Sequence, residues 1–170
     1  MVLRAALEMA GRGIHVLPVK AEKAPLTAHG VHDATADPER VAEFWRRYPA
    51  GVAMRTGQVS NIVALDLASQ DAITEALRRG LPDDTSVVKT RRGWHWYFNA
   101  PDEPLQSRDP FPGAESKAKS VYVVASTSMH QSGRRYSSYR LLTASWLIYR
   151  SGYWKRWLRA STKMQAAPQP

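Results

Sequence analysis

Residues 86–98, Ser-Val-Val-Lys-Thr-Arg-Arg-Gly-Trp-His-Trp-Tyr-Phe, place two runs rich in β-branched and aromatic residues on either side of an Arg-Arg-Gly turn. This pattern predicts a β-hairpin with strands over residues 86–90 and 94–98. Upstream, the apolar residues 61–67 predict another strand, and residues 70–79 predict a helix that ends at the following glycine. Strands, a hairpin and helices are therefore mixed, which favours an α+β or mixed α/β fold over a doubly wound parallel sheet.

The segments on either side of this region continue the mixed pattern. Asp37-Pro38 opens a helix, because aspartate caps free N–H groups and proline at the first helical position gives up an N–H that has no partner there. The proline-rich residues 100–113 are expected to form a loop. Further elements expected from apolar spacing are a helix over residues 2–10 and strands over 14–19, 51–55, 121–125 and 134–140.

The composition indicates one globular domain with a basic tail. Of the 170 residues, 44% are hydrophobic and 23% are charged, as in ordinary globular domains. The chain has no cysteine, which excludes disulfide scaffolds, thiolate zinc sites and cysteine nucleophiles. No apolar run approaches the ~20 residues of a membrane span, so a soluble cytoplasmic protein is expected. The expected division is a domain over residues 1–140 and a basic amphipathic helix with a disordered tail over 141–170.

Positive charge is concentrated towards the C-terminus. The formal net charge is +9, yet all 15 acidic residues lie between Glu8 and Glu115. Residues 116–170 contain 10 Lys or Arg residues and no acid, which favours a polyanionic partner, either nucleic acid or an anionic membrane surface. A solvated basic tail without a specific partner is the alternative. The aromatic residues of 141–170 leave a similar choice between packing on the core, contacting nucleic acid and binding a membrane surface.

Two polar residues within apolar strands are candidates for chemistry. Asp66 lies in Ile-Val-Ala-Leu-Asp-Leu, where an ionised carboxylate is costly unless it is paired, caps a turn or binds a metal. His95 lies in the hairpin on the face opposite its two tryptophan neighbours, a position that also suits a satisfied core or surface histidine. Together with the nearby basic residues Lys89, Arg91 and Arg92, the pair favours a cleft that handles phosphate groups.

Several segments, taken in order, resemble a known family. The matching segments are the opening helix and strand at residues 5–19, Lys-Ala-Pro-Leu at 23–26, Gly-Val-His-Asp-Ala-Thr at 30–35, Thr-Gly at 56–57, the histidine hairpin at 88–98, Tyr-Val-Val-Ala at 122–125 and Ser-Met-His-Gln-Ser-Gly-Arg-Arg-Tyr at 128–136. Their order and spacing are similar to those of the N-terminal primase–polymerase (prim-pol) domain of plasmid and phage replication proteins, which belongs to the archaeo-eukaryotic primase superfamily.

The resemblance implies a fold and a function. The implied fold is a mixed sheet with an RRM-like catalytic core and an N-terminal α/β module. The implied function is that of a bifunctional DNA primase/polymerase, which performs template-directed nucleotidyl transfer in plasmid or phage DNA replication. The expected partners are nucleotides and single-stranded or primer-template DNA, and a separate helicase is left open. The expected cofactor is Mg²⁺ or Mn²⁺, because these ions take hard oxygen ligands.

The resemblance also assigns site residues. Asp66 matches the family's first metal carboxylate, Glu115 stands at the third, and His95 matches the histidine that contacts the nucleotide phosphates. These three are the expected catalytic residues, and Asp66 and Glu115 are the expected metal ligands. The expected nucleotide-binding or phosphate-binding residues are Lys89, Arg91, Arg92, Ser128, His130, Arg134 and Arg135.

One position departs from the family pattern. The second carboxylate position is Ala68, which cannot bind a metal. Two hypotheses follow, an enzyme with a weakened metal site and a catalytically degenerate domain that binds nucleic acid without turnover. A third is a decayed prophage fragment whose basic tail has no selected role.

Overall fold

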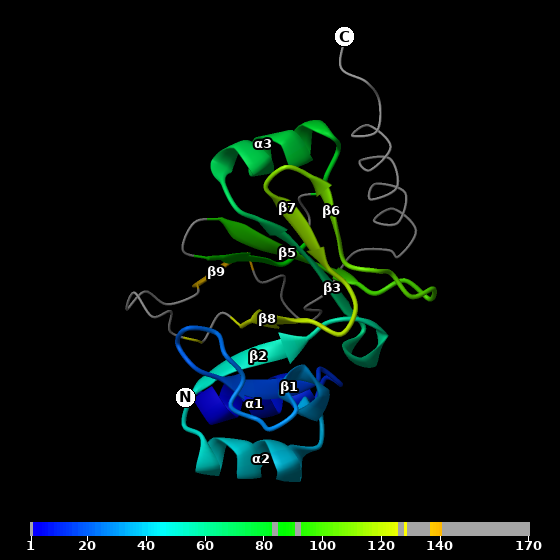
Figure 1. Cartoon of the computed structure of the whole chain (residues 1–170). Helices are drawn as coiled ribbons and strands as arrows, with labels where there is room; N and C mark the ends of the chain where they lie inside the picture. The colour runs from blue at the N-terminus through cyan, green and yellow to red at the C-terminus, as the bar shows by residue number, and fades with distance from the viewer. Residues whose placement is uncertain (1, 83–84, 91–92, 126–127, 129–136, 141–170) are drawn as a thin grey trace.

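The computed structural model describes residues 2–82, 85–90, 93–125, 128 and 137–140, and these form two β-sheets and three α-helices in layers (Figure 1). Helices α1 and α2 cover one face of the smaller sheet, and the larger sheet lies over its other face. Helix α3 covers the far side of the larger sheet. The expected α+β class is confirmed.

The smaller sheet has the strand order β1-β2-β8, with bounds Val16–Val19, Gly51–Arg55 and Tyr122–Val124. Helices α1 (Val2–Ala10) and α2 (Pro38–Arg47) pack against it. The Asp37 side chain accepts a hydrogen bond from the backbone N–H of Glu39 at 2.9 Å, as the Asp-Pro signature predicts. All four residues of β1 are buried, because both faces of this sheet are covered.

The larger sheet has the strand order β6-β7-β3-β5-β4-β9. Its strands are β3 (Ile62–Leu67), β4 (Val87–Lys89), β5 (Trp94–Asn99), β6 (Arg108–Phe111), β7 (Ala114–Lys117) and β9 (Ser137–Arg140). Every strand pair among the described residues is antiparallel, in place of the mixed sheet expected from the sequence. Helix α3 (Gln70–Arg78) follows β3 and begins at Ser69, whose hydroxyl accepts a hydrogen bond from Ala72 N at 3.2 Å. Short 3-10 turns, η1 and η2, span Gly30–Asp33 and Gln58–Ser60.

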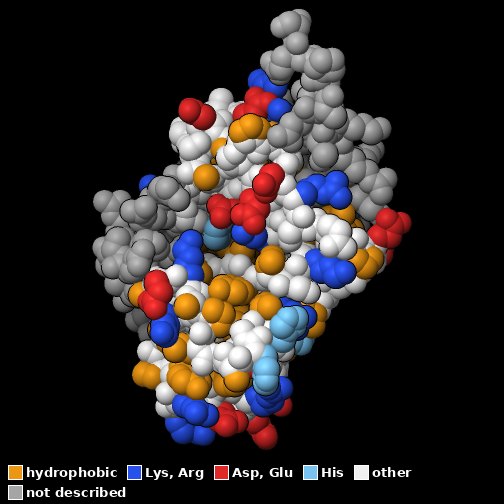
Figure 2. All heavy atoms as spheres, viewed as in Figure 1, with side chains coloured by type: hydrophobic (Ala, Val, Ile, Leu, Met, Phe, Trp, Pro, Cys, Tyr) orange, Lys and Arg blue, Asp and Glu red, His pale blue; other side chains and the backbone are white. Residues whose placement is uncertain are grey.

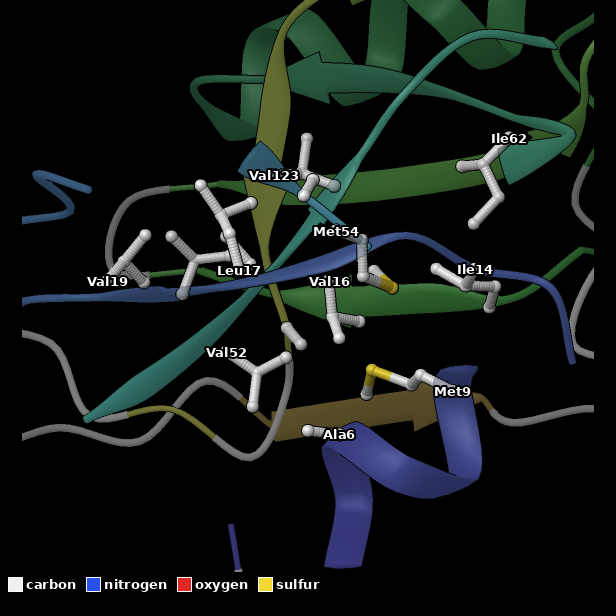
Figure 3. Packing of buried hydrophobic residues seen from close by; sticks show 14 of the residues in the cluster. Ala6, Met9, Ile14, Val16, Leu17, Val19, Val52, Met54, Ile62 and Val123 are labelled. Carbon is white, nitrogen blue, oxygen red and sulfur yellow. The ribbon is translucent and has the colours of Figure 1, made fainter. Parts of the chain in front are cut away.

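Strand β3 separates two apolar cores, because successive side chains of a strand point to opposite faces. Ile62 and Ala64 pack with residues of the smaller sheet and of α1. Figure 3 shows Ile62 and Val123 of β8 among the side chains of this cluster. Val63, Leu65 and Leu67 instead pack under α3. Asp66 shares the face of Ile62 and Ala64, so its carboxylate points to the side of the larger sheet that the smaller sheet covers.

Most predicted elements are present, with ends that differ by one or two residues, and the hairpin of residues 86–98 is formed by β4 and β5. The expected loop over residues 100–113 is wrong in its second half, which contains β6. Strands β6 and β7 form a hairpin whose turn includes Gly113 at φ +81°. Pro110 lies in β6, and this proline is tolerated because β6 is the edge strand of the sheet.

The division into residues 1–140 and 141–170 stays a prediction, since residues 141–170 lie outside the described part of the chain. Within the described ranges, none of the helices combines the length and the apolar composition that crossing a membrane requires.

Candidate functional site

Three of the sequence-predicted residues form one row across the larger sheet. Asp66 on β3 is directly opposite His95 on β5 and also directly opposite Glu115 on β7. Directly paired residues of antiparallel strands point to the same face of a sheet. The row therefore joins strands that lie far apart in the sequence, and all three side chains face the same side.

Asp66 and His95 are in contact. The Nε2 atom of His95 lies 3.5 Å from Oδ2 of Asp66, and the two side chains are 6% and 31% exposed, respectively. The other ring nitrogen, Nδ1, lies 3.3 Å from the hydroxyl of Tyr97, which is buried on the same face. The imidazole ring thus has a polar partner at each nitrogen, and these two partners fix its orientation.

The carboxylate of Glu115 forms an ion pair with the ammonium group of Lys117, two residues along β7. Glu115 is 48% exposed and Lys117 is 22% exposed. Figure 2 shows acidic side chains gathered in the middle of one face, beside a histidine and a Lys or Arg side chain. The row is therefore accessible to a ligand and carries charges of both signs.

A pocket of about 330 Å³ lies beside this row, between the two sheets. Asp66, His95 and Lys117 line it from the larger sheet, and Tyr122 and Val124 line it from β8. Lys23 reaches the same pocket from the loop after β1.

Two features distinguish the Lys23 side of this pocket: a hydrogen bond and an unusual backbone conformation. The hydroxyl of Tyr122 donates a hydrogen bond to the carbonyl oxygen of Lys23 at 3.0 Å. Lys23 and Ser120, which both line the pocket, are also two non-glycine residues with positive φ, at 75° and 53°. Non-glycine residues in this strained conformation are concentrated at functional sites.

The surroundings of Asp66 favour its ionised form. Burial by itself would raise the pKa of this carboxyl, but hydrogen bonding and the charge of His95 lower it, and Lys117 and Lys23 lower it further. The net result is a pKa below the ordinary value of 3.8. Since both lysines act on Asp66, their ammonium groups and the carboxylate form one electrostatic unit.

We expect this unit to be visible in a titration. Removing the positive charge in Lys117→Met should raise the pKa of Asp66, whereas Lys20→Met, which removes a lysine outside the pocket, should not. The pKa values are measured by NMR on the Asp66 carboxyl carbon. Because the folded-state pKa is lowered, the ionised Asp66 stabilises the fold above about pH 3.8 and loses this effect as the pH falls through the folded-state value. Equal Asp66 titrations in all three proteins would contradict the assignment.

A second pocket of about 380 Å³ borders the other side of the row. Asp66 and Glu115 line it together with Ala68 and Asp109. Asp109 lies on β6, next to β7, and sequence reasoning missed it because the proline-rich segment was expected to be a loop. Three carboxylates and the alanine at the second carboxylate position therefore border one pocket.

Comparison with protein families identifies the chain. The model of the bifunctional DNA primase/polymerase N-terminal domain matches residues 6–169. The chain belongs to this family. No curated protein matches it. The match covers the three strands that carry Asp66, His95 and Glu115, so this row lies within the primase/polymerase domain.

The primase/polymerase family generally depends on a divalent metal, but the residues of this domain do not fit a two-metal site. Among the described residues, no three His, Asp or Glu side chains are grouped so that they could hold an ion. Glu115 is engaged by Lys117, and Ala68 offers no oxygen. Divalent ions of this kind need several well-placed oxygen ligands. The pocket between the sheets has two lysines, Lys23 and Lys117, among its lining residues.

Two of the other predicted ligand-binding residues, Lys89 and Ser128, lie within the described part of the chain and apart from the row. Lys89 pairs with Trp94 across the hairpin, on the face opposite His95, and its ammonium group lies 5.4 Å from the ring centre of Trp94. The hydroxyl of Ser128 is buried, accepts a hydrogen bond from Val52 N at 2.8 Å and donates one to Val52 O at 3.0 Å. Ser128 thus extends the pairing of β2, and its proposed phosphate contact stays a prediction.

Five further predicted residues lie outside the described part of the chain, and their roles also stay predictions. They are Arg91, Arg92, His130, Arg134 and Arg135. Sequence reasoning assigned no role to Lys23 and Lys117. A signal for Lys117 was available in its spacing, because residues 115 and 117 share a face of any strand.

Proposed function

We propose that this primase/polymerase domain binds a nucleoside triphosphate in the pocket between its two sheets and adds the nucleotide to a DNA strand paired with a template. The observation that carries the proposal is the row of Asp66, His95 and Glu115, of which Asp66 and His95 line a pocket together with Lys23 and Lys117. In nucleotidyl transfer, the 3′ oxygen of the strand bonds to the α-phosphorus, and pyrophosphate leaves. The reaction therefore needs positive charge and hydrogen-bond donors around the phosphates.

Each residue of the pocket has a role in this proposal. Lys23 and Lys117 neutralise phosphate oxygens, and Nε2 of His95 donates a hydrogen bond to one of them when it carries a proton. Asp66, 3.5 Å from that nitrogen, holds the ring in position. Tyr97 fixes the opposite side of the ring.

A specific observation favours a second candidate function. Because residue 68 is alanine, Asp66 is the carboxylate that this segment contributes to the pocket. The carboxylate of Glu115 is paired with the ammonium group of Lys117. Fewer oxygen ligands mean weaker transition-state charge stabilisation by a metal, so a domain that binds nucleotide and DNA without turnover is the alternative. We expect incorporation by the natural sequence to be slow at most. Work in plasmid or phage replication, a cytoplasmic location and a separate helicase partner are also proposals, and they rest on the sequence resemblance.

Nucleotide binding tests the proposal. We expect His95→Gln to lower the affinity for a deoxynucleoside triphosphate by about tenfold, since a charge-assisted hydrogen bond is lost. Asp71→Asn, which removes an exposed carboxylate on α3, should leave the affinity unchanged. Calorimetric titration measures the affinity, and primer extension with Mg²⁺ and with Mn²⁺ measures turnover. Absence of triphosphate binding by the natural sequence would refute both candidate functions, whereas binding without extension would support the second.

A further inference from the structure

A third pocket lies outside the row described above. It has a volume of about 190 Å³ and is enclosed by three segments: the turn after β2, the loop before β6 and the connection between β7 and β8. Its charged lining residues are Arg55 and Lys119, and no carboxylate lines it. Neither of these side chains forms an ion pair with any residue that the structure describes. The pocket is therefore positively charged.

Arg55 carries a polar atom that lacks a protein partner. Its Nε atom is buried and has no hydrogen-bond acceptor among the described residues. A buried guanidinium N–H without an acceptor is costly, so such a group is normally matched by an ion, a ligand or water. Arginine is also well suited to phosphate, because its planar group offers several donors in a fixed geometry. An anion bound at this pocket would place acceptor oxygens beside the Arg55 guanidinium group.

The backbone around Arg55 is built to bring the three segments together. Thr56 donates to the Val121 carbonyl oxygen from its N–H at 2.8 Å and from its hydroxyl at 3.2 Å. Gly57 has φ +101°, and a Cβ atom there would lie 2.9 Å from the carbonyl oxygen of Ala118. Glycine thus permits a close approach that places Lys119 and Arg55 on one pocket.

The remaining walls are apolar, and they suit a sugar or base better than a free inorganic anion. Val59, Pro101 and Leu105 line this pocket, and Val59 is exposed. Ser120 lines both this pocket and the pocket beside Asp66 and His95. Both pockets therefore border the connection between β7 and β8.

We propose that this pocket binds a nucleotide unit of a single-stranded DNA chain, with the phosphodiester on Arg55 and Lys119 and the sugar or base against the apolar wall. The inference rests on the proposed function, because it assumes that a DNA strand reaches the neighbouring pocket. It adds a strand-binding site that is separate from the row of Asp66, His95 and Glu115.

The test compares charge-matched variants of the full chain. Arg55→Gln and Lys119→Gln should each weaken binding of a fluorescent oligo-dT strand by about fivefold to tenfold at low salt. Each should also reduce the magnitude of the salt slope, log affinity against log salt, by about 0.7. Arg46→Gln removes the same charge from α2, on the far side of the smaller sheet, and should have a much smaller effect. Fluorescence anisotropy measures affinity, and circular dichroism confirms that each variant is folded.

Three results separate the possible failures. If the natural sequence binds the oligonucleotide and both pocket variants match Arg46→Gln, the inference is overturned and the proposed function stands. If Lys119→Gln and Arg55→Gln weaken triphosphate binding as much as strand binding, the pocket takes free nucleotide and the inference is also overturned. Should Arg55→Gln fail to fold, the exposed Lys119 still decides, because loss of strand affinity in Lys119→Gln supports the site and no loss refutes it.

Discussion

Ala68→Asp is expected to raise Mn²⁺-dependent nucleotide incorporation by about tenfold or more over the natural sequence. Residue 68 lies two positions after Asp66 and borders the same pocket as Asp66, Asp109 and Glu115. A carboxylate there would join three others around one pocket and fill the second carboxylate position that the family resemblance implies. Oxygen ligands of this kind are those that Mg²⁺ and Mn²⁺ require. Primer extension with the two proteins side by side measures the effect.

Ala68→Asn is the matched control, because it has the size of aspartate without the charge, and it should not raise incorporation. Glu115→Asp, added to Ala68→Asp, should raise incorporation further, since the family resemblance implies an aspartate at this third carboxylate position. The expectation is wrong if the natural sequence already extends primers efficiently and Asp66→Asn abolishes extension. In that case the site works with the carboxylates and lysines it has.

Gly93→Ala is expected to destabilise the fold by about 3 kcal/mol or more, the largest stability effect of any single substitution considered. A Cβ atom at Gly93 would overlap the carbonyl oxygen of Leu67 and lie 2.9 Å from the carbonyl carbon of Ala68. Both contacts are with backbone, which cannot move aside as a flexible side chain can. Urea unfolding measures the free energy, and the same displacement should separate His95 from Asp66 and weaken triphosphate binding.

Gly11→Ala provides the comparison, because its Cβ atom would lie at an ordinary distance of 3.4 Å from the Leu7 carbonyl oxygen. This variant should unfold with nearly the same free energy as the natural sequence. Gly93→Ser should behave like Gly93→Ala, because its Cβ atom would meet the same backbone atoms. A stable Gly93→Ser protein with unchanged triphosphate affinity would show that β3 and β5 can separate without cost to the site.

Strands β3 and β5 of the row were predictable because their signals are local, whereas β7, which carries Glu115, was not expected as a strand. The apolar run around Asp66 and the alternation around His95 each span a few residues, and the period of a strand fixes which side chains share a face. The edge strand with Pro110 was not predictable in this way. Its pairing depends on Ser116, whose hydroxyl bonds to Arg108 N and to Arg108 O at 3.0 Å each. With that strand mistaken for a loop, Asp109 was missed as a neighbour of the row.

By itself, the sequence determined the α+β class, the start of helix α2 at Asp37-Pro38, the hairpin of residues 86–98 and the family resemblance on which the choice of Asp66, His95 and Glu115 rests. These depend on local periodicity and on the order of segments. Only the tertiary structure decided the direct pairing of Asp66 with both partners, the turning of Lys89 to the other face and the position of Lys23 beside the row. Pairing register and the approach of two sheets are set by contacts between residues far apart in the chain, and such contacts leave no pattern in any short stretch of sequence.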